Sequence, residues 1–153
     1  MTRTIKSLGI LVLFLGIAGI VMGGVFVGLG MSRDNLLKAN MRAENVNMGI
    51  VDPNLKNEAI DSLSEAMKAG DTIRQHRHSI APSYDALLAG GRFDPTNPAH
   101  LTYAQAMNLE NYLYLAVTAF GLTQAVMGTG AFMIITGLAI GATGIVLLKL
   151  SRA

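Results

Sequence analysis

The chain has 153 residues, of which 51% are hydrophobic and only 14% are charged, and its mean hydropathy is +0.42. About a quarter of the residues of an ordinary soluble domain are charged, so this composition favours a membrane protein with at most one small extramembrane domain. The chain lacks cysteine, which excludes disulfide staples, thiolate nucleophiles and metal sites built on sulfur ligands.

Charge is distributed unevenly along the chain. Four bases stand at the two ends, namely Arg3, Lys6, Lys149 and Arg152. The other eight bases and all ten acids lie between residues 33 and 110, so the middle is formally −2 and the ends +4. Because lysine and arginine concentrate on the cytoplasmic side of membrane spans, we expect both termini to be cytoplasmic and the middle extracytoplasmic. No basic stripe with interleaved aromatic residues indicates nucleic-acid binding.

The first apolar run predicts a transmembrane helix over residues 7–31, after a cytoplasmic segment 1–6. This run holds 25 residues without a charge, and about 20 suffice to cross the hydrocarbon core. A cleaved signal peptide is the alternative, but its apolar region is shorter, about 7 to 15 residues, and ends at a small-x-small site. Ser32 and Arg33 follow here instead. We therefore expect an uncleaved anchor.

The second apolar region, 112–148, is uncharged and too long for one perpendicular span. Two short spans would place Lys149 and Arg152 outside, against the charge distribution. We expect one long helix starting near Thr102, with Gln105 completing a capping box. Its segment 129–148 crosses the membrane, 149–153 is cytoplasmic, and 112–128 is an interfacial or protruding part that the outer domain covers.

Glycines recur every seven residues in both predicted spans: Gly9, Gly16, Gly23 and Gly30, then Gly130, Gly137 and Gly144. A seven-residue repeat defines one face of a left-handed helix pair, and small residues there permit close packing in lipid. We expect these faces to pack together, although glycine is also simply frequent in membrane helices. Gly24 with Gly28, and Gly137 with Gly141, are small-xxx-small pairs that suit a second face.

Between the spans, residues 32–111 predict an all-helical extracytoplasmic bundle. Asp52 and Pro53 predict a capped helix start, and an apolar stripe then continues to about Ile80: Ile60, Leu63, Met67, Gly70 and Ile73. Residues 88–98 have turn chemistry. The fold class is therefore a two-span helical hairpin with an outer helical bundle.

The candidate chemical residues are the three histidines, His76, His78 and His100, together with Glu110. Together they are candidate ligands for iron or zinc, but His76 and His78 lie two residues apart and point about 200° apart on a helix. The alternative is a cationic helix end formed with Arg74 and Arg77. Glu110 then forms a structural ion pair with Arg74 or Arg77. We expect no catalytic residue and no cofactor.

Three segments carry a resemblance to a known group: 76–82 (HRHSIAP), 93–98 (FDPTNP) and 101–112 (LTYAQAMNLENY). The chain resembles, over most of its length and both spans, small bacterial two-span membrane proteins often labelled "aromatic ring-opening dioxygenase". That label implies a two-histidine, one-carboxylate iron site, and no motif of that spacing occurs here. The resemblance thus implies placement in a bacterial plasma membrane.

From these features we expect a non-catalytic accessory or scaffolding component whose partners are membrane lipids and other membrane subunits or copies of itself. Two alternatives stay open. One is a metal-dependent oxygenase subunit that uses the four residues above. The other is an extracytoplasmic sensor or ligand-binding module.

Overall fold

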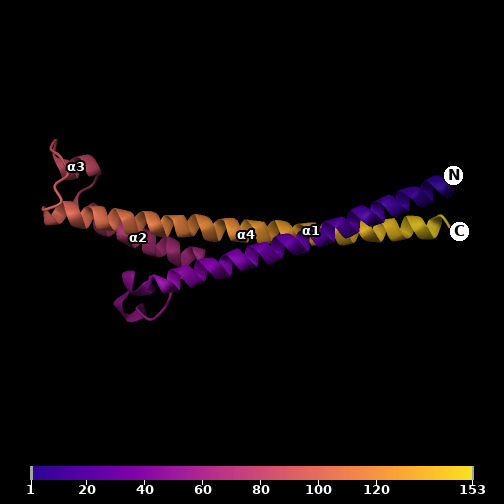
Figure 1. Cartoon of the computed structure of the whole chain (residues 1–153), viewed down its shortest axis with the longest axis horizontal. Helices are drawn as coiled ribbons and strands as arrows, with labels where there is room; N and C mark the ends of the chain where they lie inside the picture. The colour runs from indigo at the N-terminus through magenta and orange to yellow at the C-terminus, as the bar shows by residue number, and fades with distance from the viewer. Residues whose placement is uncertain (1, 153) are drawn as a thin grey trace. The chain divides into compact units, whose positions relative to one another are not determined.

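The structure is a computed structural model that describes residues 2–152, and it is all-helical (Figure 1). Within these residues four α-helices and two short 3-10 helices follow one another: α1 (Thr2–Ala43), η1 (Met48–Ile50), η2 (Pro53–Leu55), α2 (Leu63–Ile80), α3 (Tyr84–Leu88) and α4 (Pro98–Leu150). Among residues 2–152 no strand forms, and one isolated bridge joins Asn47 to Ala59. The predicted all-helical fold with two long apolar helices is confirmed.

The chain divides into two compact units. The first, here called the helix pair, comprises residues up to Asp34 and from Leu122 onward, and the second, the outer unit, comprises Asn35–Gly121. Helices α1 and α4 each contribute to both units. In α4 the division falls between Gly121 and Leu122, inside the segment 112–128 that the sequence separates from the second span.

Within the helix pair, α1 and α4 run antiparallel and contact each other through the glycines of the seven-residue repeat. All seven of these glycines are buried. A Cβ placed on Gly16 would lie 2.5 Å from the backbone nitrogen of Gly141, and one on Gly23 would lie 2.5 Å from the carbonyl oxygen of Gly130. The two backbones therefore approach each other more closely than any side chain allows, as expected where small residues line a helix interface.

The outward surface of the helix pair is apolar. Among its large apolar side chains, Phe132 is 69% exposed, Ile135 is 68% exposed and Phe14 is 66% exposed. Gly24 and Gly28 also face outward, because a Cβ on either would meet nothing within 4 Å. Both long helices have a charge-poor window whose hydropathy suits a membrane span, and this window is 11% buried in the first helix and 17% buried in the second.

The outer unit has its own hydrophobic core between α2, α4 and the end of α1. Its fully buried side chains are Met41, Ile60, Leu113 and Phe120, packed with the small residues of α2. The segment 112–121 of α4 is covered on one side only, since Leu113 and Phe120 are buried while Leu115 is 67% exposed. The expectation that the outer domain covers this whole segment is therefore wrong for one face.

The predicted start of α2 is wrong. Asp52 caps a turn, and its carboxylate accepts the N–H of Asn54 at 2.9 Å, but that turn is only the 3-10 helix Pro53–Leu55. The helix α2 starts after Ser62, whose hydroxyl accepts the N–H of Glu65 at 3.3 Å. The Glu65 carboxylate in turn accepts the N–H of Asp61, one residue before the N–H of Ser62 that a capping box would use.

Two further sequence expectations need correction. Met67 was placed on the apolar stripe but is 43% exposed, whereas Ala66 and Ala69 are fully buried. The last helix begins at Pro98, one turn before Thr102, because the Asn97 side chain accepts the N–H of Ala99 at 2.9 Å and caps the helix there. From Pro98 to Leu150, α4 is unbroken.

Candidate functional site

The candidate site begins with the close packing of α2 on α4 inside the outer unit. The contact face of α2 holds three buried small residues, Ala66, Ala69 and Gly70. A Cβ on Gly70 would meet the ring of Tyr114 at 3.4 Å, at the near edge of van der Waals contact, so α2 lies close against α4 here. Because small residues bring the two helices together, the longer polar side chains further along α2 reach α4.

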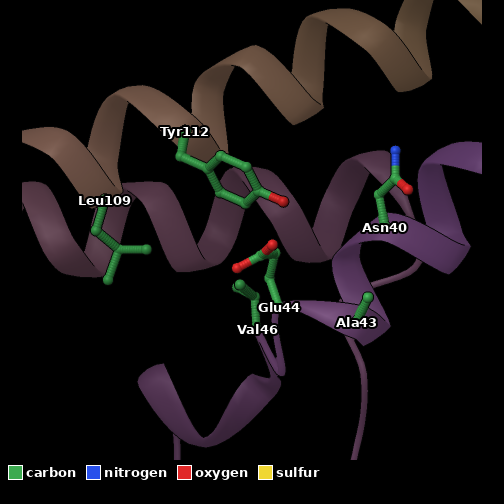
Figure 2. A pocket seen from close by; sticks show the side chains of 6 residues that line it. All are labelled: Asn40, Ala43, Glu44, Val46, Leu109 and Tyr112. Atoms are coloured by element: carbon green, nitrogen blue, oxygen red, sulfur yellow. The ribbon is translucent and has the colours of Figure 1, made fainter.

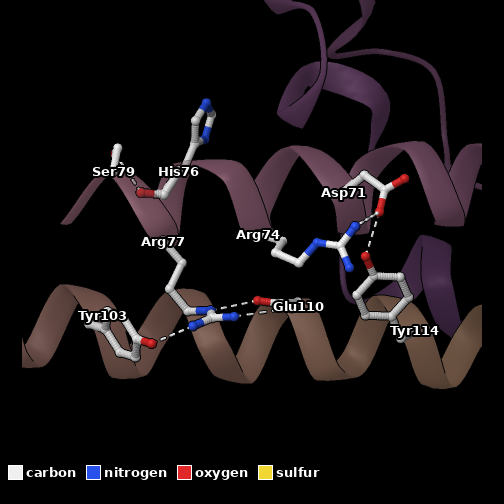
Figure 3. Close-up of polar contacts among 8 residues, drawn as sticks. All are labelled: Asp71, Arg74, His76, Arg77, Ser79, Tyr103, Glu110 and Tyr114. Carbon is white, nitrogen blue, oxygen red and sulfur yellow. Dashed lines mark hydrogen bonds and ion pairs between the residues drawn. The ribbon is translucent and has the colours of Figure 1, made fainter. Parts of the chain in front are cut away.

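Arg77 forms the centre of these polar contacts (Figure 3). Its Nε donates to Glu110 Oε2 at 2.6 Å, and its Nη2 lies 3.4 Å from Oε1 of the same carboxylate. A further Arg77 nitrogen donates to the hydroxyl of Tyr103, whose ring lies under the guanidinium at 4.9 Å from its centroid. The side chains of Arg77 and Glu110 are only 13% and 10% exposed, so this ion pair is largely removed from solvent.

The electrostatic environment of Arg77 favours its charged form. The hydrogen bond to Glu110 raises the pKa of Arg77 against the opposing effect of desolvation, and the Coulombic attraction of the same carboxylate adds to the increase. The guanidinium of Arg77 therefore stays charged over the whole physiological pH range. Such a pair acts as a fixed cross-link between helices.

A second polar group lies two turns earlier on α2. Tyr114 donates its hydroxyl hydrogen to Asp71 Oδ1 at 2.5 Å, and Arg74 binds the same oxygen at 2.8 Å. The Arg74 guanidinium also lies 5.6 Å from the centroid of the Tyr114 ring. Asp71 and Arg74 are nearly half exposed, at 44% and 48%, so this pair contributes little to stability.

Together these two groups form what we call the polar seam, which joins α2 to α4: Asp71, Arg74, Arg77, Tyr103, Glu110 and Tyr114 (Figure 3). Two acids and two bases balance, so the polar seam has no net charge. Each carboxylate binds an arginine, and both tyrosine hydroxyls are hydrogen-bonded. A general base or nucleophile needs a group that is free to act on a substrate, and the polar seam commits its groups to each other.

The four residues suggested for a metal are not gathered in one place. Among residues 2–152, no group of three or more histidine, aspartate or glutamate side chains is arranged to hold a metal ion. Glu110 binds Arg77 instead, and the His76 ring is directed away from that pair (Figure 3). His100 accepts the N–H of Asp94 at Nδ1, 2.9 Å away, and its ring stacks on Phe93. His78 is exposed.

The alternative of a cationic helix end is also corrected in part. Arg77 binds Glu110, and Arg74 binds Asp71, so neither arginine is left to attract headgroups or an acidic partner. The expected structural ion pair of Glu110 is present, with Arg77 as the partner. The sequence did not indicate the contacts of Asp71 and Tyr114. The only sequence pattern related to these contacts is the three-residue spacing of Asp71, Arg74 and Arg77 along one helix.

The outer unit also has an open pocket of about 470 Å³ between the end of α1 and α4 (Figure 2). Its polar side chains are Asn40, Glu44 and Tyr112, and its apolar walls are Ala43, Val46 and Leu109. This volume lies within the range of about 300 to 1,000 Å³ that is usual for small-ligand pockets. A carboxylate beside a phenol and an amide suits a small cationic or hydrogen-bonding ligand.

Comparison with known proteins yields no match: no family model, curated protein or solved structure corresponds to this chain. The resemblance to the small two-span membrane proteins therefore stays a prediction.

Proposed function

We propose that this protein is a two-span scaffold of a bacterial plasma membrane. In this proposal α1 crosses the membrane over residues 7–31 and α4 over 129–148, both termini are cytoplasmic, and residues 32–111 form an extracytoplasmic helical domain. The protein then acts as a non-catalytic accessory component of a larger membrane complex or of a homo-oligomer. It binds the other subunits through helix packing and through the surface of the outer unit.

The apolar exterior of the helix pair supports membrane insertion. Side chains such as Phe14, Phe132 and Ile135 are about two-thirds exposed, and the charge-free runs extend over more residues than a bilayer requires. In water such a surface would associate without specificity, whereas hydrocarbon solvates it. The four bases at the chain ends and the formal −2 of the middle support the orientation.

The observation that carries the scaffold role is the self-neutralised polar seam. Arg77 and Glu110 are the most buried charged pair of the outer unit, the kind of group that enzymes place in active sites, and they bind each other and Tyr103. Such an arrangement holds α2 against α4 and presents a fixed outer surface. Fixed helical surfaces suit the binding of other subunits.

The test is gentle detergent extraction from the native membrane, followed by particle mass, identification of co-purifying chains and metal analysis on one sample. We expect a large assembly or a defined oligomer with no stoichiometric metal. Arg77→Gln, which disrupts the outer unit, should release partners that bind that unit, whereas Arg74→Gln at the exposed pair serves as the matched control. A lone chain with about one iron or zinc would refute the scaffold role and favour the oxygenase subunit.

The pocket at Tyr112 favours one second candidate, an extracytoplasmic ligand-binding module. Its three polar side chains face a cavity of about 470 Å³ that a small cation or polar metabolite would fit. Ligand binding stabilises the folded state by RT ln(1 + [L]/Kd), so the melting temperature rises with the logarithm of the ligand concentration once it exceeds Kd. A screen of small amines should then shift the wild type but not Glu44→Gln, and a screen without any shift would reject this candidate.

A further inference from the structure

A groove in the helix pair combines an apolar floor with one cation. It has a volume of about 360 Å³, and its lining from α1 includes Phe26, Leu29, Gly30 and Arg33. From α4 it includes Leu122 and Val126. We call this the Arg33 groove. Arg33 is its one charged lining residue, and the volume is that of a ligand pocket.

Arg33 has no partner within the described chain. Its side chain is exposed, and it forms no ion pair or hydrogen bond with any of residues 2–152. The neighbouring acid, Asp34, accepts the hydroxyl of Thr123 at 3.4 Å instead of binding Arg33. A guanidinium has five donors, and no hydrogen bond within residues 2–152 uses those of Arg33, so it is suited to an external anion, above all a planar or tetrahedral oxyanion.

The sequence position of Arg33 gives the depth of this cation. It is the first charged residue after the uncharged run that follows Lys6. If that run crosses the bilayer, as the proposed function holds, Arg33 lies where the hydrocarbon ends and the headgroups begin. On α4 the groove is lined by Leu122 and Val126, which belong to the interfacial segment 112–128, so it faces the headgroup ends of the acyl chains. The Arg33 guanidinium is then level with the lipid phosphates. This step rests on the proposed function.

We propose that the Arg33 groove binds one phospholipid, with an acyl chain along Leu29, Leu122 and Val126 and the lipid phosphate on the Arg33 guanidinium. At Gly30 the two helices are in close contact, because a Cβ there would lie 2.4 Å from Cγ of Met127, so the acyl chain lies along the outside of the pair. The phosphate supplies the acceptors that Arg33 lacks, and arginine and phosphate form short, charge-assisted hydrogen bonds. The lipid class recognised is therefore a phosphate-bearing, preferably anionic, diacyl lipid.

A second groove in the same unit provides an internal control. It has about 300 Å³ and is lined by Leu13, Ile17, Ile20, Leu138 and Ile145, and it includes no charged residue. This groove offers the same apolar contact without a headgroup ligand. Lipid contact there should be unselective, whereas binding at the Arg33 groove should depend on the phosphate.

The experiment is native mass spectrometry of the full-length protein, purified in detergent and titrated with phosphatidylglycerol or with a diacylglycerol of the same acyl chains. We expect one phosphatidylglycerol to stay bound to the wild type and the diacylglycerol to dissociate. Arg33→Gln should weaken phosphatidylglycerol binding about tenfold, the effect of losing one charge-assisted contact. Arg3→Gln, which removes one charge at the opposite end of the pair, should bind as the wild type does.

Equal binding by the wild type and Arg33→Gln would overturn the proposal, and so would equal binding of the two lipids. Val126→Phe fills the groove without changing charge and should also lower lipid binding. If Val126→Phe instead dissociates a dimer seen in the same spectra, the groove is an interface between copies and the proposal is wrong. Helicity by circular dichroism checks that each variant is folded.

Failure of the proposed function would be seen separately. Carbonate extraction and flotation of cell membranes report whether the protein is integral to the membrane. A protein that leaves the membrane under carbonate would refute the two-span proposal itself. An integral protein that retains no phosphatidylglycerol would refute only the lipid site.

Discussion

The helix pair predicts opposite effects for one substitution, glycine to alanine, at two positions of α1. At Gly16 the new Cβ would lie 2.5 Å from the nitrogen and 2.6 Å from the Cα of Gly141. Real Cβ atoms do not approach backbone atoms so closely, and backbone cannot rotate away as a side chain does. At Gly24 the same Cβ meets nothing within 4 Å.

The magnitude follows from two opposing contributions. Overpacking a close interface costs about 1–3 kcal/mol, and exchanging glycine for alanine inside a helix returns about 0.5–1 kcal/mol. Gly24→Ala has only the gain in helix propensity and should raise the free energy of unfolding slightly. Gly16→Ala has both and should lower it by roughly 1–2 kcal/mol. The difference between the two variants cancels the helix propensity, so it isolates the packing cost of about 1–3 kcal/mol.

The assay is reversible unfolding of the purified protein in mixed micelles by sodium dodecyl sulfate, followed by circular dichroism. Fluorescence transfer between labels at the two chain ends reports the separation of α1 from α4 in the same titration. Gly16→Ala should separate the helices at lower detergent fraction than the wild type, and Gly24→Ala at the same or a higher fraction. If both variants behave alike, the glycine contact between α1 and α4 does not hold the pair together.

Three further predictions concern the outer unit. Arg77→Met should lower the free energy of unfolding by about 3 kcal/mol in thermal denaturation, because it leaves the largely buried carboxylate of Glu110 without its partner. Adding Glu110→Leu should restore most of this loss, and an additive second loss would contradict the prediction. Tyr114→Phe removes one hydrogen bond and should cost about 1 kcal/mol in the same assay, with no loss meaning that the bond is not formed. The hydroxyl and amide of Thr96 lower the pKa of Asp94 below its ordinary 3.8, so this turn is stabilised above that pH and loses the contribution as the pH falls through the lowered value. The Asp94 carboxyl resonance should titrate below 3.8 in the wild type and closer to 3.8 in Thr96→Ala, and identical titration curves would contradict the contact.

Periodicity along the chain predicts the helix faces because one helix repeats its geometry every turn. The seven-residue spacing of Gly9, Gly16, Gly23 and Gly30 requires no knowledge of the partner, and the structure places these residues against α4. The charge-free runs likewise predict two long helices, since nothing in them favours a turn. These features are local or repeat regularly, which is why sequence is sufficient for them.

Helix starts were predicted less well because several residues compete for the same cap. Asp52 with Pro53 is a good start signal, yet it supports only one 3-10 turn. The chain then turns so that Ile60 enters the core, and Ser62 provides the actual cap of α2. The last helix likewise begins before the predicted Thr102, because Asn97 caps it and a proline occupies its first helical position.

The polar seam shows where sequence reasoning ends. Either Arg74 or Arg77 was an acceptable partner for Glu110, because both lie near the same end of α2. The choice depends on how α2 lies along α4, and small residues over thirty positions away from Glu110 set that position. The contact between Tyr114 and Asp71 depends on the same register, so no local pattern could predict it.

The most direct test of the central claim is to label single introduced cysteines in intact cells and so determine on which side of the membrane each lies. The sequence has no cysteine of its own, so all labelling comes from the introduced thiol. Thr4→Cys, Gln75→Cys and Arg152→Cys place one thiol at each end and one on α2, all at exposed positions. A membrane-impermeant maleimide should label Gln75→Cys from outside, and it should label the other two only after the cells are lysed. Labelling of either terminal cysteine in intact cells, or protection of Gln75→Cys, would contradict the proposed two-span hairpin with an extracytoplasmic domain.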